Sequence, residues 1–167
     1  MKKTLLFALI ACAFLGACST SDKAGDVASS SDSDKMMTWG DADITNLEDT
    51  QLSHRFKKAV SPIVYFNLNE SSLSPAALDI LNEQVVWLQN NPAALVVIEG
   101  HCDERGTREY NLALGERRAS AVKDFFKANG IVDERIRTIS YGKERPDVFG
   151  STEAAWSKNR RAVTIVN

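Results

Sequence analysis

The chain has 167 residues, of which 44% are hydrophobic and 25% are charged, and this ordinary globular composition suggests a single domain. Its 20 basic and 22 acidic residues give a net charge of -2. Neither this balance nor any basic run indicates nucleic acid as a partner.

An export signal is predicted at the N-terminus. Two lysines precede the apolar run "TLLFALIACAFLGA" at residues 4–17, which is too short to span a membrane comfortably as a permanent helix. A buried core helix is the alternative, but the position directly after the lysines favours a signal. The sequence "LGAC" at residues 15–18 resembles the lipobox of bacterial lipoproteins. We therefore expect a lipoprotein signal peptide at residues 1–17, lipid on Cys18, and sorting to the outer membrane because Ser19 follows.

A flexible tether is predicted at residues 18–50. Residues 19–35 are rich in Ser, Asp and Ala and hold one large apolar residue, Val27, so they cannot bury enough surface to offset ordering. Such a tether has a root-mean-square span of roughly 30 Å and an extended reach of about 110 Å. A weak helical stripe follows, formed by Ile44, Leu47, Leu52 and Phe56, and we expect His54 in this region to be a solvated surface residue.

Strands and helices alternate through the rest of the chain. Short β-branched or alternating runs predict strands at residues 62–68, 94–100, 135–142 and 160–167. Helical spacing and capping residues predict helices at residues 73–91, 107–129 and 151–159. Ser74 and Pro75 suit the start of the first of these helices, and Gly130 suits the end of the second. The order β-α-β-α-β-α-β predicts an α/β (α+β) domain with helices on one face of a sheet.

The segment "GHCDERGTREYNLALGERRASAV" at residues 100–122 is unusually rich in charge. On a helical wheel, Asn111 and Arg118 fall on the apolar stripe with Leu114, whereas Arg117 lies off it. A buried cation needs a partner, and Asp103 in the preceding loop is the obvious candidate. Two interpretations remain open at this point: a structural Asp103–Arg118 salt bridge, or a cleft whose separated charges bind a zwitterion.

Enzymatic interpretations are disfavoured. His101, Cys102, Asp103 and Glu104 are consecutive, so their side chains alternate in direction and are poorly placed to converge on a metal or to form a nucleophile–base pair. We expect Cys102 to pack as a small side chain or to be a free thiol, and Glu104, Glu116 and Arg117 to be solvated. No cofactor, metal or catalytic residue is predicted.

Three long motifs identify a family resemblance. The stretches "VVIEGHCDERGTREYNLALGERRASAVKDFF", "ISYGKERPDVFG" and "EAAWSKNRRAVTIV" resemble the OmpA-like C-terminal domain, and most closely the domains of peptidoglycan-associated lipoproteins. The resemblance covers about residues 61–167, within a domain predicted to span 51–167. It implies a four-stranded mixed sheet packed against helices. It also implies non-covalent binding of the diaminopimelate side chain in the peptidoglycan peptide stem, which carries a free amine and a free carboxylate.

The resemblance also implies site residues. Asp103 would receive the ligand ammonium and Arg118 its carboxylate. Other positions that match the family's pocket are Thr107, Asn111, Leu114, Leu68 and Asn69. The sequence departs from the family at two places, since the family usually has Asp at position 69 and Thr or Ala at position 102.

The resemblance further implies a role. It predicts a non-enzymatic outer-membrane lipoprotein whose periplasmic domain tethers the membrane to the cell wall within the Tol-Pal system, which serves envelope integrity and cell division, with TolB among its partners. The alternative is an OmpA-like lipoprotein that acts mainly as a docking module for Tol proteins, with weak wall binding because of Asn69.

Overall fold

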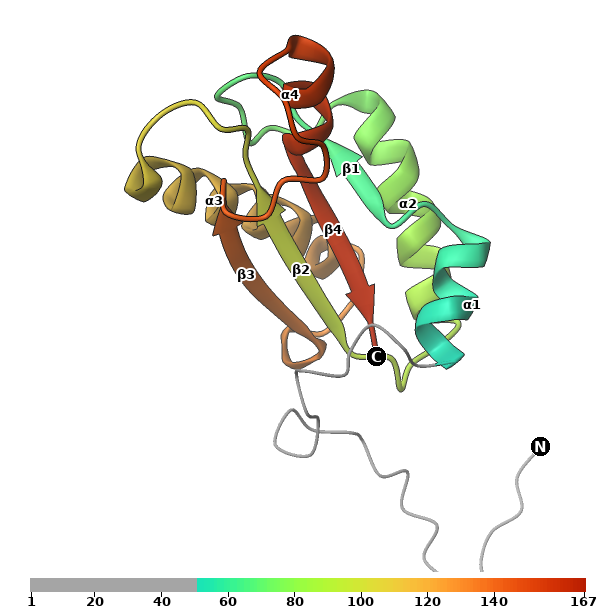
Figure 1. Ribbon diagram of the computed structural model, residues 1–167. Helices are drawn as coiled ribbons and strands as arrows, with labels where there is room; N and C mark the ends of the chain where they lie inside the picture. Colours follow the sequence, from blue (N-terminus) through green and yellow to red (C-terminus); the bar gives the residue numbers. More distant parts are fainter. Residues whose placement is uncertain (1–50) are drawn as a thin grey trace, which may run out of the picture. The chain divides into compact units, whose positions relative to one another are not determined.

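The computed structural model describes residues 51–167 (Figure 1). The predicted signal peptide at 1–17, lipidated Cys18, tether at 18–50, and Ile44 and Leu47 of the weak helical stripe lie outside the described residues. The elements follow in the order α1 (Gln51–Ala59), β1 (Ile63–Tyr65), α2 (Pro75–Gln89), β2 (Val96–His101), α3 (Arg108–Ala128), the 3-10 turn η2 (Asp133–Arg135), β3 (Ile136–Gly142), α4 (Glu153–Asn159) and β4 (Arg161–Val166). The predicted alternation is confirmed, and Leu52 and Phe56, the described residues of the weak helical stripe, lie in α1.

The four strands form one mixed sheet in the order β1-β4-β2-β3. β2 and β3 are parallel, whereas β4 runs antiparallel to both of its neighbours, β1 and β2. The predicted four-stranded mixed sheet is therefore confirmed. The C-terminal ends of β1 and β2, together with the start of β4, meet at one end of the sheet, the upper end in Figure 1.

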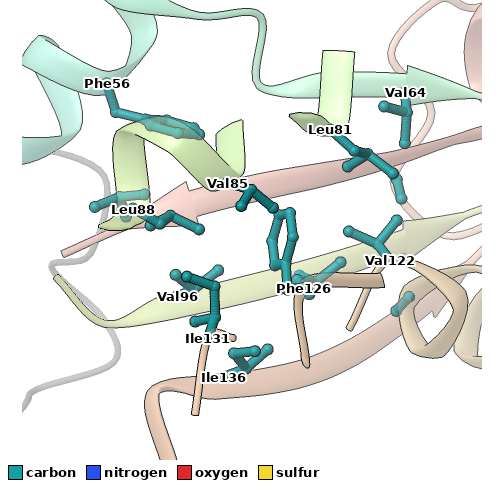
Figure 2. Packing of buried hydrophobic residues seen from close by; sticks show 14 of the residues in the cluster. Phe56, Val64, Leu81, Val85, Leu88, Val96, Val122, Phe126, Ile131 and Ile136 are labelled. Carbon is teal, nitrogen blue, oxygen red and sulfur yellow. The ribbon is translucent and has the colours of Figure 1, made fainter. Parts of the chain in front are cut away.

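The hydrophobic core lies between the sheet and helices α1, α2 and α3. Figure 2 shows Phe56 of α1, Leu81 of α2 and Phe126 of α3 in one cluster with Val96 of β2. Phe56 of α1 packs edge-on against Trp87, with ring centroids 5.0 Å apart. A smaller cluster, formed by Val97 and Ile165 with Ile139 and Val163 packed against them, involves the alternate residues of the strands.

Side-chain caps fix the starts of the long helices, as the sequence predicts for α2. The Ser74 side chain accepts a hydrogen bond from the backbone N of Ala77 at 3.2 Å, and Pro75 occupies the first turn of α2. Thr107 caps α3 in the same way through the backbone N of Tyr110. These bonds satisfy amide groups that have no partner within the helix.

The first strand is shorter than predicted. Residues 62–68 read as one strand, but only Ile63–Tyr65 form it. Beyond Tyr65 the chain turns away, and Asn69 has a φ of 57°, a left-handed conformation that Asn tolerates better than most residues. The carbonyl groups of this loop accept hydrogen bonds from arginine side chains instead of from a neighbouring strand.

Two glycines let α3 approach the sheet closely. A Cβ atom on Gly100 of β2 would overlap the backbone carbonyl of Gly115 in α3. This contact fixes the height of α3 over β2 and places Arg118, one turn further along, near the C-terminal end of that strand. None of the helices in residues 51–167 is long and apolar enough to cross a membrane.

Candidate functional site

A small cavity lies at the end of the sheet where β1 and β2 terminate. It is lined by Leu68, Asn69, Cys102, Asp103, Arg105, Asn111, Leu114, Arg118 and Arg160. Its volume is about 10 Å³, which is room for about one water molecule. Six of the seven residues that the sequence assigns to the ligand pocket line this cavity, and Thr107 is the exception.

Arg118 is completely buried and bonded mainly to backbone carbonyls. Its Nε donates to the carbonyl of Glu70 at 2.9 Å, Nη1 donates to that of His101 at 2.8 Å, and Nη2 donates to that of Asn67 at 3.1 Å. Burial lowers the pKa of Arg118, although an arginine still stays charged in a protein. This guanidinium therefore joins the loop after β1 to the end of β2.

Asp103 is also buried, but its partners are two other arginines. Arg105 places Nη2 2.6 Å from Oδ2 and Nε 3.2 Å from Oδ1, and Nη1 of Arg160 lies 3.3 Å from Oδ2. Desolvation alone would raise the pKa of Asp103, but the hydrogen bonds from Arg105 and Arg160 outweigh it and hold the pKa below its usual value. Asp103 is thus an ionised carboxylate at neutral pH.

The expected partnership between Asp103 and Arg118 is not formed within residues 51–167. Both side chains line the cavity, yet each is held by other groups. The reason is that carbonyl oxygens can satisfy a guanidinium as well as a carboxylate can. Of the two interpretations left open by the sequence, the geometry favours separated charges over a structural salt bridge.

Arg160, which sequence reasoning missed, links three parts of the site. It donates from Nε to the Phe66 carbonyl at 3.1 Å and from Nη2 to Glu153 at 2.7 Å, in addition to its bond to Asp103. The doubled arginine at the junction of α4 and β4 is the only sequence signal for it, and no periodicity marks it as buried.

The remaining predicted residues form the walls and rim. Asn111 donates from Nδ2 to the carbonyls of Arg105 and Thr107 at 2.7 and 3.0 Å, so it holds the loop before α3 in place. Leu114 is buried, whereas Leu68 is half exposed at the rim. Thr107 is exposed and serves as the cap of α3.

Cys102 behaves as a packed thiol rather than as a reactive one. Its Sγ donates to the Asn111 carbonyl at 3.3 Å and accepts from Nη1 of Arg118 at 3.5 Å. Burial raises the pKa of the thiol, so it stays protonated and poorly nucleophilic. This confirms the prediction of a small packed side chain.

The other charged or polar residues of the segment lie outside the cavity. His101 is buried with its ring stacked on Tyr141. Glu104, Glu116 and Arg117 are exposed, as predicted, although Glu104 accepts a hydrogen bond from the Trp156 indole at 3.0 Å. In the described part of the chain, no group of three or more His, Cys, Asp or Glu side chains is placed to hold a metal ion.

Comparison with known proteins shows the family and supports the fold. A family model described as "OmpA family" matches residues 65–160. The peptidoglycan-associated lipoprotein of Brucella melitensis is 49% identical over 115 residues, which cover 69% of this chain and 68% of that protein. The peptidoglycan-associated lipoprotein of Haemophilus influenzae is 48% identical over 100 residues, covering 60% and 65% respectively.

Solved structures show the same architecture. The crystal structure of the peptidoglycan-associated lipoprotein from Burkholderia pseudomallei is 37% identical and superposes with a TM-score of 0.63, covering 64% of this chain and 91% of that one. The C-terminal domain of Helicobacter pylori MotB superposes with a TM-score of 0.59 at 15% identity, over 63% of this chain and 83% of that one. At that identity, the second match speaks for the fold alone.

Proposed function

The chain belongs to the OmpA family, and from this premise we propose that it binds peptidoglycan non-covalently through the diaminopimelate of the peptide stem. Relatives at about half identity are named peptidoglycan-associated lipoproteins. The observation that carries the proposal is the cavity itself, which combines the ionised Asp103 and the charged Arg118 with apolar walls from Leu68 and Leu114.

The two charges suit the two ends of the ligand side chain. Asp103 offers a carboxylate to an ammonium group, and Arg118 offers a guanidinium to a carboxylate. A guanidinium has five N–H donors, and the contacts of Arg118 described above use four of them. The remaining donor belongs to Nη2, so Arg118 can contact a ligand carboxylate without releasing the loop after β1.

The wider role follows from the resemblance. In this proposal Cys18 carries the lipid that holds the chain in the outer membrane, residues 18–50 span the gap, and the domain at 51–167 binds the wall in the periplasm. The protein acts without catalysis, within the Tol-Pal system, and TolB is a protein partner. This arrangement would link the outer membrane to the wall during growth and division.

Titration of the full-length protein in detergent tests the proposal. We expect it to bind a muropeptide that contains meso-diaminopimelate and to bind the lysine-containing analogue much more weakly, because lysine lacks the second carboxylate. Asp103→Asn should lose most of this binding, whereas Glu104→Gln, which changes the exposed neighbouring acid, should retain it. Equal affinity for the two muropeptides would overturn the assignment of the ligand.

The docking alternative has its own signature. Binding to TolB together with no binding to either muropeptide would favour a protein-docking module. In that case Asn69→Asp, which restores the residue usual in the family, is the variant expected to recover binding to the wall.

A further inference from the structure

The carboxylate of the proposed ligand site is already occupied by a cation of the protein itself. Arg105 approaches Asp103 with two guanidinium nitrogens, at 2.6 and 3.2 Å, and lines the cavity that has room for about one water molecule. This two-nitrogen approach is the geometry in which arginine binds a carboxylate most strongly. An incoming ammonium therefore meets a site that is filled from within.

We propose that Arg105 is a displaceable gate, which closes the ligand site in the free protein and which the ligand ammonium replaces at Asp103. This inference rests on the proposed function. It makes Arg105 a specificity-determining residue, because a ligand that carries only apolar or anionic groups has nothing to exchange for the guanidinium and leaves the site closed.

The two arginines on Asp103 differ in their freedom to leave. The Arg160 side chain is 8% exposed and is also bonded to the Phe66 carbonyl and to Glu153. The Arg105 side chain is 34% exposed. Arg160 is thus a fixed support of Asp103, and Arg105 is the partner on the solvent side.

A second resting place for the guanidinium is already present. The Arg105 guanidinium carbon lies 4.0 Å from the centroid of the Trp156 ring, and its Nη2 lies 3.9 Å from Oε2 of Glu153. A cation over an aromatic face is stabilised by the ring. Arg105 can therefore release Asp103 and remain paired with Trp156 and Glu153.

The movement is confined to the side chain. The Arg105 backbone N donates to Oδ1 of Asp103 at 3.1 Å, and its carbonyl accepts from Nδ2 of Asn111 at 2.7 Å. Because both backbone groups are held, the loop that carries Asp103 keeps its shape while the guanidinium swings away.

Removal of the gate tests the inference. If the closed arrangement accounts for about nine-tenths of the free protein, Arg105→Gln should bind the meso-diaminopimelate muropeptide about tenfold more tightly. The matched control is Arg108→Gln, which removes an exposed arginine paired with Glu144 and should leave the affinity unchanged. Equal or weaker binding by Arg105→Gln, relative to this control, contradicts the gate.

A second measurement follows the guanidinium itself. The Nε–H resonance of Arg105, assigned by its absence from the Arg105→Gln spectrum, should shift when the muropeptide is added, because its hydrogen bond to Asp103 is broken. An unchanged resonance in the presence of saturating ligand overturns the gate. If Arg105→Gln does not fold, Arg105→Lys serves instead. Lysine keeps the charge but cannot contact Asp103 with two nitrogens, so this variant should bind the muropeptide more tightly than wild type but less than about tenfold more tightly.

Failure of the gate is distinguishable from failure of the proposed function. If the wild-type protein binds and Asp103→Asn does not, but Arg105 neither moves nor affects affinity, only the gate is wrong. If neither the wild-type protein nor Arg105→Gln binds the muropeptide, the proposed function is wrong and the gate is wrong with it.

Discussion

Replacing Arg118 with alanine is expected to destabilise the domain as well as to affect ligand binding. Arg118 is completely buried, and its guanidinium bonds to the carbonyls of Asn67, Glu70 and His101. The first two belong to the loop after β1, and the third ends β2. The substitution therefore removes the contact that joins one wall of the cavity to the other.

The size of the loss in unfolding free energy depends on which of these carbonyl groups water can reach in Arg118→Ala. His101 is buried, so its carbonyl loses a charge-assisted bond worth about 2 kcal/mol. Asn67 and Glu70 are exposed, so water replaces their donors at a loss of about 0.5 kcal/mol each. Lost packing of the side-chain stem adds about 1–2 kcal/mol, and the recovered desolvation of the guanidinium offsets about 1 kcal/mol. We expect a net loss of about 3–4 kcal/mol in the free energy of unfolding.

Urea unfolding of the full-length protein, followed by circular dichroism, measures this loss. With a slope of about 1.5 kcal/mol per molar urea, the midpoint should fall by about 2–2.7 M. Arg117→Ala is the matched control, since this neighbour is exposed and should change the free energy by less than about 0.5 kcal/mol. If Arg118→Ala unfolds at the same urea concentration as Arg117→Ala, the structural role assigned to Arg118 is wrong.

Three further predictions concern charge, thiol chemistry and packing. The folded pKa of Asp103 lies below its unfolded value of about 3.9, so the stability that its ionised form contributes is complete above that value and is lost as the pH falls below about 4. The difference in unfolding free energy between wild type and Asp103→Asn should therefore shrink in acid. A pH-independent difference would refute this. Peptide mass spectrometry should show Cys102 labelled by a thiol reagent at least about a hundredfold faster in urea than in buffer, and equal rates would show the thiol to be accessible. Gly100→Ala forces a Cβ into the α3 backbone and should lower the free energy of unfolding by about 3 kcal/mol or more. Gly130→Ala meets open space, so only its positive φ opposes alanine, and the loss should be about 1 kcal/mol. Similar unfolding midpoints for the two variants would contradict the close approach of α3.

The sequence predicts the order of elements well because the signals are local. Ser74 caps α2 as expected. The helical wheel also predicts that Asn111 and Arg118 face the core despite their polarity, and both are buried. Burial on a helix depends on spacing of 3.6 residues, which can be read directly from the sequence.

The partners of the buried charges are much harder to predict. Charge matching selects Asp103 for Arg118, but the structure gives Arg118 three carbonyls, and every residue in the chain has one carbonyl to offer. Arg160 reaches Asp103 across 57 positions of sequence. Arg105 lies in a loop, where no periodicity shows which way a side chain points. The family resemblance therefore supplies the pocket residues, whereas the hydrogen-bond network requires coordinates.

The position of β4 also governs how the domain can fold. Arg161–Val166 are the last strand of the described residues but lie between β1 and β2 in the sheet. Within residues 51–167, β1 pairs with β4 alone. The residues of β1 are synthesised about a hundred residues before those of β4, so β1 cannot pair until almost the whole domain has been made. Such long-range pairing slows folding. It also means that a chain still being synthesised cannot complete the sheet until Arg161–Val166 have left the ribosome.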